Sequence, residues 1–301
     1  MRVLNFGSLN IDHVYAVDHL VRPGETLDSD GYRVFPGGKG LNQSLALAGA
    51  GVQVAHAGKV GKEGEWLKEK LAASGVDTSF LDVVDEAGGH AIIQVDKSGE
   101  NAIVLHGGAN KLIDGQDAEM VVSQFEEGDY LLLQNEISSI PDIMECGARR
   151  GLIIMFNPAP MDPAVMDYPL HLVSLFCLNE IEGGELTGES TPSAILDAMS
   201  AKYPDAATVL TLGKKGAIYA DGEKRLAVTG LEVNAADTTA AGDTFIGYLL
   251  AGIMDGIGEE ETLNRACRAA AICVTREGAA DSIPRRDELY VVAIGDERMG
   301  F

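Results

Sequence analysis

The sequence holds few cysteines, and none is spaced for a disulfide framework or a metal site. Cys146, Cys177, Cys267 and Cys273 are the only four in 301 residues. No two of them form a C-x-x-C pair, and no Cys/His cluster has the spacing of a zinc site. We therefore expect buried free thiols in a reducing compartment.

Basic residues are also scarce. Lys and Arg total 23 against 46 Asp and Glu, so the formal net charge is -23 and the pI is about 4.5. Such a surface repels nucleic acid and anionic membranes, and we expect neither as a partner. An anionic substrate would need a local positive site made of backbone N–H groups, a helix N-terminus or a metal ion.

Long apolar runs are missing as well. No run approaches the ~18 residues of a membrane span. The N-terminal residues MRVLNFGSLNID become polar too soon for a signal peptide. A cytoplasmic protein is therefore expected, and its 46% hydrophobic content is that of an ordinary globular chain.

The chain does have a regular alternation of short apolar runs and longer amphipathic stretches. Buried strands are expected at 3–9, 130–134, 152–156, 172–178 and 207–212, and helices at 64–74, 141–150 and 193–202. Near-continuous apolar strands alternating with helices are typical of an α/β fold. This pattern predicts a central, mostly parallel sheet flanked by helices on both faces.

Two regions break the alternation. Residues 12–35 are weakly alternating and contain glycine, and residues 90–96 and 101–106 flank the turn-like tetrad KSGE. Together they predict a small antiparallel β-sheet attached to the main body as a lid, with strands from about 12–35 and 90–106. Because no linker is evident, we expect residues 1–301 to form a single domain.

A glycine-rich segment, Gly37-Gly38-Lys39-Gly40, precedes a predicted helix at 41–49. Its spacing is not that of a P-loop, and no G-x-G-x-x-G follows a strand, so a dinucleotide enzyme is not expected. Glycines here would let the backbone approach a ligand closely. Taken alone, the segment is equally compatible with a plain loop.

A second segment, DTTAAGDTF at 237–245, leads into a helix with one apolar face. The residues Ala240, Ala241, Gly242 and Asp243 therefore lie at a helix N-terminus, where exposed N–H groups and the helix dipole favour negative charge. This is a suitable place for a phosphoryl group in transfer. For a lone Asp in this position, an N-terminal cap is the more common role.

Ten motifs in one order give the sequence a resemblance to a known family. They are GSLNID (7–12), PGE (23–25), FPGGKGLNQ (35–43), GGAN (107–110), LLLQNE (131–136), NPAP (157–160), LNE (178–180), TLGKKG (211–216), DTTAAGDTF (237–245) and VTREGAADSIP (274–284). In this order they resemble the ribokinase-like, PfkB-type carbohydrate kinases over nearly the whole chain. The resemblance implies ATP-dependent phosphorylation of a small furanose, with D-ribose and its 5-hydroxyl favoured.

The resemblance also implies roles on the sugar side of the site. Asp243 would be the catalytic base, and the N–H groups of Ala240, Ala241, Gly242 and Asp243 would form an anion hole. Asn10 and Asp12, at the end of the first strand, would bind the sugar hydroxyls. The other implied substrate ligands are Gly38, Lys39, Gly40, Asn42 and Glu136.

On the nucleotide side, the resemblance implies that ATP lies against Asn179, Thr211, Gly213, Gly216 and Gly242. Glu182 would hold Mg²⁺ through water, as is common in kinase sites. A K⁺ ion would be ligated, largely by carbonyls, at Asp237, Thr239, Cys273, Arg276, Gly278 and Ser282. One departure is Cys267, where the family often has Asn or His near the nucleotide base.

Alternatives to ribose are deoxyribose, another pentose, a hexose or a nucleoside. Asn10 favours ribose, because a 2-hydroxyl needs a hydrogen-bonding partner. A non-catalytic sugar or nucleotide sensor on the same fold is the alternative from another class. The lid predicts a homodimer, in which Val14, Ala16, Ile93 and Val95 lie on the face turned away from the sugar.

Overall fold

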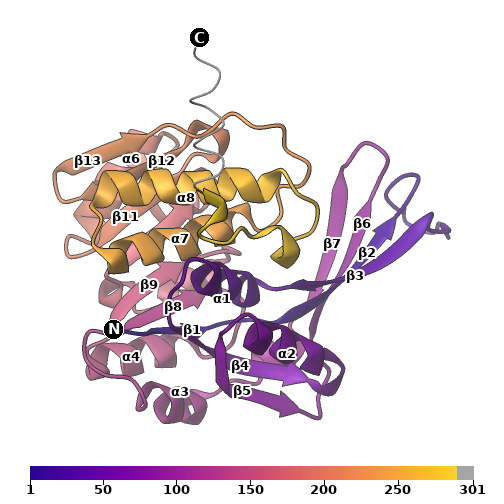
Figure 1. Ribbon diagram of the computed structural model, residues 1–301, viewed down its shortest axis with the longest axis horizontal. Helices are drawn as coiled ribbons and strands as arrows, with labels where there is room; N and C mark the ends of the chain where they lie inside the picture. Colours follow the sequence, from indigo (N-terminus) through magenta and orange to yellow (C-terminus); the bar gives the residue numbers. More distant parts are fainter. Residues whose placement is uncertain (290–301) are drawn as a thin grey trace.

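A computed structural model describes residues 1–289 as an α/β body from which a smaller sheet projects (Figure 1). The large sheet has nine strands in the order β13-β12-β11-β10-β9-β8-β1-β4-β5. Residues 290–301, which the predicted single domain included, lie outside the described part. The strands are β1 (Val3–Phe6), β4 (Val54–Gly61), β5 (Asp77–Val84), β8 (Tyr130–Gln134), β9 (Ile153–Asn157), β10 (Leu175–Asn179), β11 (Ala207–Thr211), β12 (Ala217–Asp221) and β13 (Lys224–Val228).

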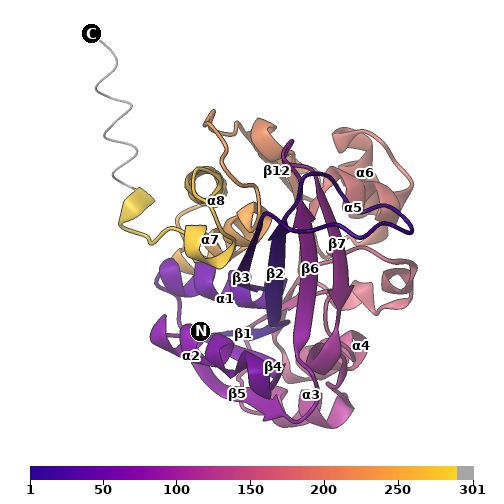
Figure 2. The ribbon, with the colours of Figure 1, turned by 90° about the vertical axis from the view of Figure 1, so that its right-hand side faces the viewer.

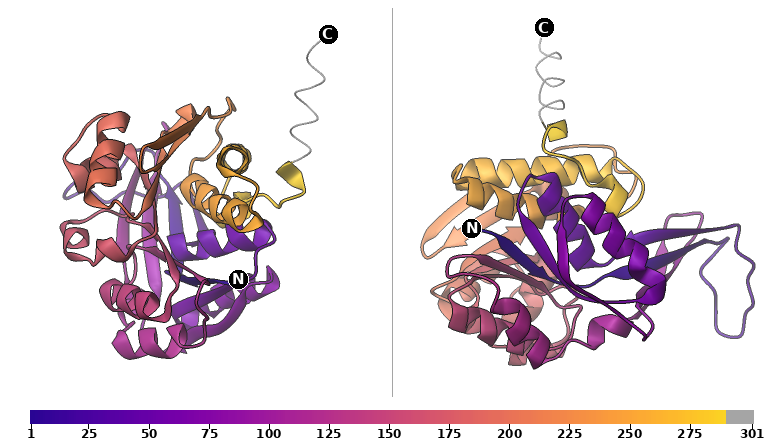
Figure 3. Two further views of the ribbon diagram at one scale, coloured as in Figure 1. Left: turned by 90° about the vertical axis from the view of Figure 1, so that its left-hand side faces the viewer. Right: turned by 60° about the horizontal axis from the view of Figure 1, so that its bottom comes forward.

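The large sheet is parallel from β5 to β11, and the β12–β13 hairpin continues it in antiparallel pairing. Strands such as β8 are buried along their whole length, because helices cover both faces. Figure 3 shows the two helical layers on either side of the sheet. One layer is α1 (Lys39–Gly49), α2 (Glu65–Ala73), α7 (Ala241–Asp255) and α8 (Glu259–Val274); the other is α3 (Gly115–Val122), α4 (Ile140–Arg150), α5 (Glu180–Thr187) and α6 (Pro192–Lys202).

Most predicted strand and helix bounds agree with the structure to within a residue or two. Two strands are shorter than predicted. The first ends at Phe6, and the one predicted at 172–178 begins at Leu175 because Leu170–Leu172 forms a 3-10 turn. No helix within residues 1–289 is long and apolar enough to cross a membrane.

The lid sheet has four strands, which Figure 2 shows side by side in the order β3-β2-β6-β7. They are β3 (Gly31–Gly37), β2 (Asn10–Ala16), β6 (Gly89–Val95) and β7 (Asn101–His106). The sheet is mixed, not antiparallel as predicted, because β2 and β6 pair in parallel. The chain between these two strands passes through β4, α2 and β5 of the main body, which is long enough for the crossover that parallel pairing requires.

The pairing register also assigns the two faces of the lid. Val14 pairs with Ile93, two residues beyond the pair Asp12–Ala91, and side chains two apart on a strand share a face. Val14, Ala16, Ile93 and Val95 therefore lie on the face of Asp12, and the predicted assignment of these residues to the opposite face is wrong. The opposite face carries His13, Tyr15, Tyr32, Val34, Ile92 and Val104.

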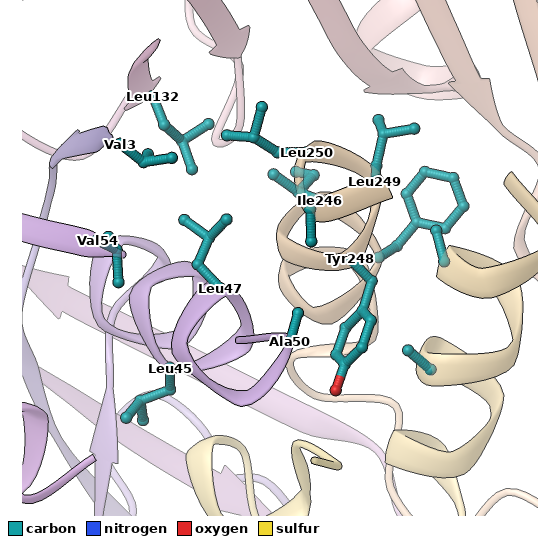
Figure 4. Packing of buried hydrophobic residues seen from close by; sticks show 14 of the residues in the cluster. Val3, Leu45, Leu47, Ala50, Val54, Leu132, Ile246, Tyr248, Leu249 and Leu250 are labelled. Atoms are coloured by element: carbon teal, nitrogen blue, oxygen red, sulfur yellow. The ribbon is translucent and has the colours of Figure 1, made fainter. Parts of the chain in front are cut away.

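Helices α1 and α7 cross closely, and this crossing positions the site. A Cβ on Gly247 of α7 would collide with Ala46 and with the backbone of Leu47 in α1. In Figure 4, Leu47 and the α7 residues Ile246 and Leu250 gather in one apolar cluster beside the sheet. The first turns of the two helices are thereby held against each other.

Candidate active site

The carboxyl ends of the central strands and the first turns of α1, α5 and α7 enclose a cleft of about 100 Å³. Such an edge is where ligands bind in open α/β sheets. The residues lining the cleft are Lys39, Asn157, Ala159, Cys177, Leu178, Asn179, Glu182, Thr211, Gly242, Asp243 and Ile246. Six residues predicted for the site, three of them charged, thus face one space although they are spread along the chain from position 39 to position 243.

Asp243 lies in the first turn of α7 and is only 7% exposed. Its side chain does not cap the helix. Instead, Oδ2 accepts a hydrogen bond from Asn42 Nδ2 at 3.0 Å, and Oδ1 accepts one from Gln43 Nε2 at 2.9 Å. Two amides of α1 therefore hold both oxygens of the carboxylate beside the cleft.

The residue before α7, Ala240, has the left-handed backbone conformation at φ 62°, which is strained for a residue with a Cβ. The turn it makes directs the N-terminus of α7 toward the cleft, where Gly242 is exposed to the open space. The first N–H groups of a helix have no acceptor inside the helix. Ala241 N donates to Thr238 O at 3.4 Å, so the N–H groups of Gly242 and Asp243 are the donors that this turn offers to an anion.

The predicted sugar ligands Asn10 and Asp12 lie at the start of β2, in the lid, and not at the end of the first strand as predicted. The reason is that β1 ends at Phe6 and the chain turns at Gly7. Oδ1 of Asn10 accepts from Asn110 Nδ2 at 2.8 Å, which leaves its own amide N–H groups for a ligand. Burial and the nearby Glu136 carboxylate raise the pKa of Asp12 to about 7.

Glu136 follows the end of β8 and connects the turn after β1 with the GGKG segment. Its Oε2 accepts from Lys39 N at 2.9 Å and is also hydrogen-bonded to Ser8 Oγ. Gly40 packs so closely on Ser8 and Gly7 that a Cβ would overlap them, and Gly38 has φ 93°. Glycine is therefore required at both positions by packing or backbone conformation.

Lys39 is the cation of the cleft. Burial lowers the pKa of its ammonium group, but the carboxylates of Asp243, Glu136 and Glu182 outweigh this and raise it. Asn42, one turn along α1, has its Oδ1 buried without a hydrogen-bond partner among residues 1–289. An unpaired buried acceptor is costly, so this atom suits a hydroxyl donor of a ligand.

On the predicted nucleotide side, Asn179 and Glu182 form a capping box on α5. Asn179 Oδ1 accepts from Glu182 N at 2.9 Å, and Glu182 Oε2 accepts from Asn179 N at 3.0 Å. Glu182 is buried, and burial raises the pKa of its carboxyl group. The cap orders both side chains at the edge of the cleft.

Thr211 ends β11 and lines the cleft, whereas Gly213 and Gly216 lie in the turn that follows and are not among the lining residues. Gly213 has φ 57° and Gly216 has φ 108°. A Cβ on Gly216 would overlap the carbonyl of Val228 in β13. The close approach of the chain at the end of β13, together with the positive φ, therefore requires glycine at this position.

The predicted potassium residues come from two stretches of chain that meet beside α7. Asp237 Oδ1 accepts from Thr239 N at 2.9 Å and Oδ2 accepts from Gly278 N at 3.2 Å. Cys273 Sγ and Ser282 Oγ form a hydrogen bond at 3.0 Å. The Arg276 side chain instead pairs with Glu288. Within residues 1–289 no group of three or more His, Cys, Asp or Glu could hold a metal, so any ion here would depend on carbonyls, water or a ligand.

Three residues of the site had no predicted role: Gln43, Asn110 and Gln134. Asn110 holds Asn10, Gln43 holds Asp243, and Gln134 donates to Gln43 at 2.8 Å. All three stand inside the motifs that carry the family resemblance. Their positions in those motifs were the only signal in the sequence.

Comparison with known proteins identifies the family of the chain. The family model described as "pfkB family carbohydrate kinase" matches residues 2–286. The ribokinase of Haemophilus influenzae is 38% identical over 295 residues, covering 94% of this chain and 95% of that one. The chain therefore belongs to the pfkB family of carbohydrate kinases, as the resemblance predicted.

Two solved structures share the fold. Ribokinase from Cryptococcus neoformans in complex with ADP has a TM-score of 0.83 at 34% identity, covering 97% of this chain and 99% of that one. Ribokinase from Arabidopsis thaliana complexed with ribose and ATP has a TM-score of 0.86 at 28% identity, covering 97% and 98%. The predicted fold class, a flanked and mostly parallel sheet with a separate lid sheet, is confirmed.

Proposed function

We propose that this chain transfers the γ-phosphoryl group of ATP to the 5-hydroxyl of D-ribose, giving D-ribose 5-phosphate and ADP. The observation that carries the proposal is the placement of Asp243, a buried carboxylate held by two amides at the N-terminus of α7, in one cleft with Lys39 and Glu182. The ribokinases similar to this chain, one of them complexed with ribose and ATP, support the choice of substrates.

In this proposal Asp243 accepts the proton of the 5-hydroxyl as that oxygen attacks the γ-phosphorus. The N–H groups of Gly242 and Asp243, which follow the strained Ala240, stabilise the charge that develops on the phosphoryl oxygens, and Ala241 N would join them if it left Thr238 O. Lys39 adds a positive charge beside the same group. Because the ribose hydroxyl and the Asp243 carboxylate would be held in place, most of the rate enhancement would come from positioning.

The sugar would lie between the lid and the GGKG segment. Asn10 would donate to the 2-hydroxyl, since its own Oδ1 is occupied by Asn110. Asp12 would accept from hydroxyl groups, and the buried Oδ1 of Asn42 would take another donor. Gly38 and Gly40 would let the backbone of the segment approach the ring, and Glu136 fixes that segment through Lys39 N.

The nucleotide would lie along the cleft past Asn179, Thr211 and Gly242, with Gly213 and Gly216 shaping the adjacent turn. Glu182 would hold a magnesium ion through water, because it is a carboxylate with hard oxygen atoms that lines the cleft and is ordered there by hydrogen bonds from Asn179 to both oxygens. Mg²⁺ would neutralise phosphate charge when bound. The loop pair of Asp237, Thr239, Cys273, Gly278 and Ser282, with the Arg276 backbone, fits a K⁺ ion held by carbonyls.

We also propose that residues 1–301 act as one kinase unit and pair as a homodimer through the outer face of the lid. That face exposes Tyr32, Val34, Ile92 and Val104, the last 70% accessible. A four-stranded sheet cannot bury such a face by itself, and a two-fold contact with a second copy would cover it.

An ADP-release assay over D-ribose, 2-deoxyribose, other pentoses, hexoses and nucleosides tests the substrate. We expect the highest kcat/KM for D-ribose. A better rate with any other acceptor would replace ribose by that acceptor. Binding of sugar and ATP without any ADP release would favour the non-catalytic sensor.

A further inference from the structure

Behind Asp243 lies a row of buried polar side chains, which we call the amide relay: Gln43, Gln134, Asn5, Ser44 and His56. Each is at most 1% exposed. Gln43 Nε2 donates to Asp243 Oδ1 at 2.9 Å, and Gln43 Oε1 accepts from Gln134 Nε2 at 2.8 Å. The relay thus begins at the carboxylate and leads away from the cleft into the core.

The remaining contacts lead to the backbone. Gln134 Nε2 also donates to Asn5 Oδ1 at 2.8 Å, and Asn5 Nδ2 donates to Ser44 Oγ at 2.8 Å. Ser44 Oγ is 2.8 Å from His56 Nδ1, and His56 Nε2 is 3.2 Å from the carbonyl oxygen of Gly7. The residues come from β1, α1, β4 and β8, so the relay ties four elements together.

Two backbone carbonyls set the direction of the hydrogen bonds in the relay: His56 Nε2 faces the carbonyl oxygen of Gly7, and Asn5 Nδ2 also donates to the carbonyl oxygen of Gly40 at 2.8 Å. A carbonyl oxygen can only accept, so His56 carries its proton on Nε2 and presents Nδ1 as an acceptor. Burial lowers the pKa of His56 to about 4, which keeps the ring neutral at neutral pH. Ser44 must then donate to His56 and accept from Asn5, and Asn5 must accept from Gln134.

The same logic reaches the carboxylate. Gln134 gives one amide hydrogen to Asn5 and has the other for Gln43, so Gln43 receives at Oε1 and turns its own N–H group toward Asp243. With the amide reversed, two oxygens would face each other with no proton between them. The relay therefore excludes the one rotamer of Gln43 that would repel the carboxylate.

We propose that Gln43 is a positioning residue for Asp243, and that the amide relay behind it decides which way its amide faces. The proposal rests on the proposed role of Asp243 as the base. It adds that the orientation of this base is set from the backbone carbonyls of Gly7 and Gly40, through buried side chains that do not line the cleft.

The packing around Gly7 is a second observation that bears on the position of Gln134. A Cβ at Gly7 would lie 2.6 Å from Gln134 Oε1 and 2.6 Å from the Cα of Gly40. That Oε1 is buried without a partner among residues 1–289. Both N–H groups of Gln134 donate within the relay, and its Oε1 lies beside Gly7. A side chain at position 7 would therefore displace Gln134 from its place beside Gln43.

Gln134→Glu is the sharpest test, because residue 134 does not contact Asp243 and the change keeps its shape. A carboxylate cannot donate, so Gln43 would turn its N–H group to the new carboxylate at position 134 and its oxygen to Asp243. We expect a single-turnover rate about 10- to 100-fold lower, with KM for sugar and for ATP close to that of the parent. Gln43→Met, which removes the contact without adding charge, should lower the same rate.

Gln43→Glu supplies a readout that a purely structural defect would not move. When ionised, the new carboxyl group at position 43 repels Asp243; when protonated, it can donate a hydrogen bond to Asp243. We expect the rate of this variant relative to the parent to recover as the pH is lowered from weakly alkaline to weakly acidic. Thr208→Val, a change at another buried polar residue of the sheet, is the matched control and should lose stability without this loss of rate.

The outcomes separate this inference from the proposed function. If Asp243→Asn is inactive, and Gln134→Glu and Gln43→Met fold but react slowly, the proposed function and the role of the relay are both supported. If Asp243→Asn is inactive but the two relay variants react as fast as the parent, only the role of the relay is overturned. An active Asp243→Asn overturns the base and the relay together. If Gln134→Glu does not fold, Gln43→Met and the pH profile of Gln43→Glu decide in its place.

Discussion

Asn110 Nδ2 donates to Asn10 Oδ1 at 2.8 Å although the residues are 100 positions apart in the chain. The same Asn110 exchanges hydrogen bonds with the backbone of Leu9, accepting from its N–H at 3.0 Å. The 3-10 turn that carries Asn110 thereby clamps the start of β2. Because Asn10 Oδ1 is already bonded, its amide N–H groups remain for the proposed contact with the sugar, and this role can be tested.

Asn10→Met should weaken the use of ribose and favour 2-deoxyribose by comparison. The variant leaves the 2-hydroxyl without a partner, which corresponds to roughly 1–3 kcal/mol of discrimination. The measurement is the ratio of kcat/KM for the two sugars, with KM for ATP as the internal control. An unchanged ratio would show that Asn10 does not recognise that hydroxyl.

Asp243→Ala should lower kcat by about 10²- to 10⁴-fold or more, because it removes the proposed base from the reacting hydroxyl. Ribose binding, followed by calorimetry, should change little. Glu260→Ala, at an exposed acidic residue in the first turn of α8, is the matched control for losing a carboxylate at a helix start. A variant that keeps a tenth of the parent kcat would remove Asp243 from its assigned role.

Sugar binding should depend on pH through Asp12, whose pKa is raised to about 7 by burial and by Glu136. Above this pH the carboxylate is ionised and accepts from hydroxyl groups, whereas below it the group is protonated and loses an acceptor. KM for ribose should therefore rise as the pH falls below about 7, and Asp12→Asn should abolish the slope. A flat KM profile in the parent would contradict this.

The raised pKa of Asp12 also predicts how the stability of the folded protein depends on pH. The pKa of Asp12 is higher in the folded protein than its ordinary value of 3.8, so ionising the buried group costs free energy. The ligand-free protein should lose stability as the pH rises from about 4 to 7, and Asp12→Asn should remove that part of the loss. Denaturant unfolding of both proteins at several pH values measures it.

Activity should fall when K⁺ is replaced by Na⁺ or by a bulky organic cation. A K⁺ ion beside the hydrogen bonds from Thr239 N and Gly278 N to Asp237 would order the turn that precedes the anion hole. The assay is kcat at fixed ionic strength in each salt, with Asp237→Ala expected to be less sensitive to the cation. Equal rates in all salts would count against this site.

Sedimentation should detect a homodimer of the 31.8 kDa chain, formed through the outer face of the lid. Val104→Asp places a charge on that face and should yield monomers. Ile103→Asp is the matched control, because the neighbouring side chain on β7 points to the opposite face. A parent protein that sediments only as a monomer at micromolar concentration would refute the dimer and leave the kinase assignment unaffected.

Much of the main body could be predicted from local pattern. The strand Tyr130–Gln134 begins with a continuous apolar run, and a run of that kind is typical of a strand buried on both faces. The helix that starts at Ala241 was predicted from its apolar spacing, and with it the position of Asp243 in the first turn. These features depend on neighbours in the chain.

The lid and the relay could not be predicted in this way. The parallel pairing of β2 with β6 joins strands separated by more than seventy residues, and only that register assigns Val14 to the face of Asp12. Gln43 and Gln134 are of a residue type usually found at the surface, and neither the apolar run before Gln134 nor the motifs that contain them shows that they bond to each other and to Asp243. The sequence by itself determined the family, the strand and helix pattern and the order of the site motifs, because each is local or is carried by spacing. The tertiary structure alone decided which amide holds the carboxylate, since hydrogen bonds between distant side chains exist only after the helices and strands have packed.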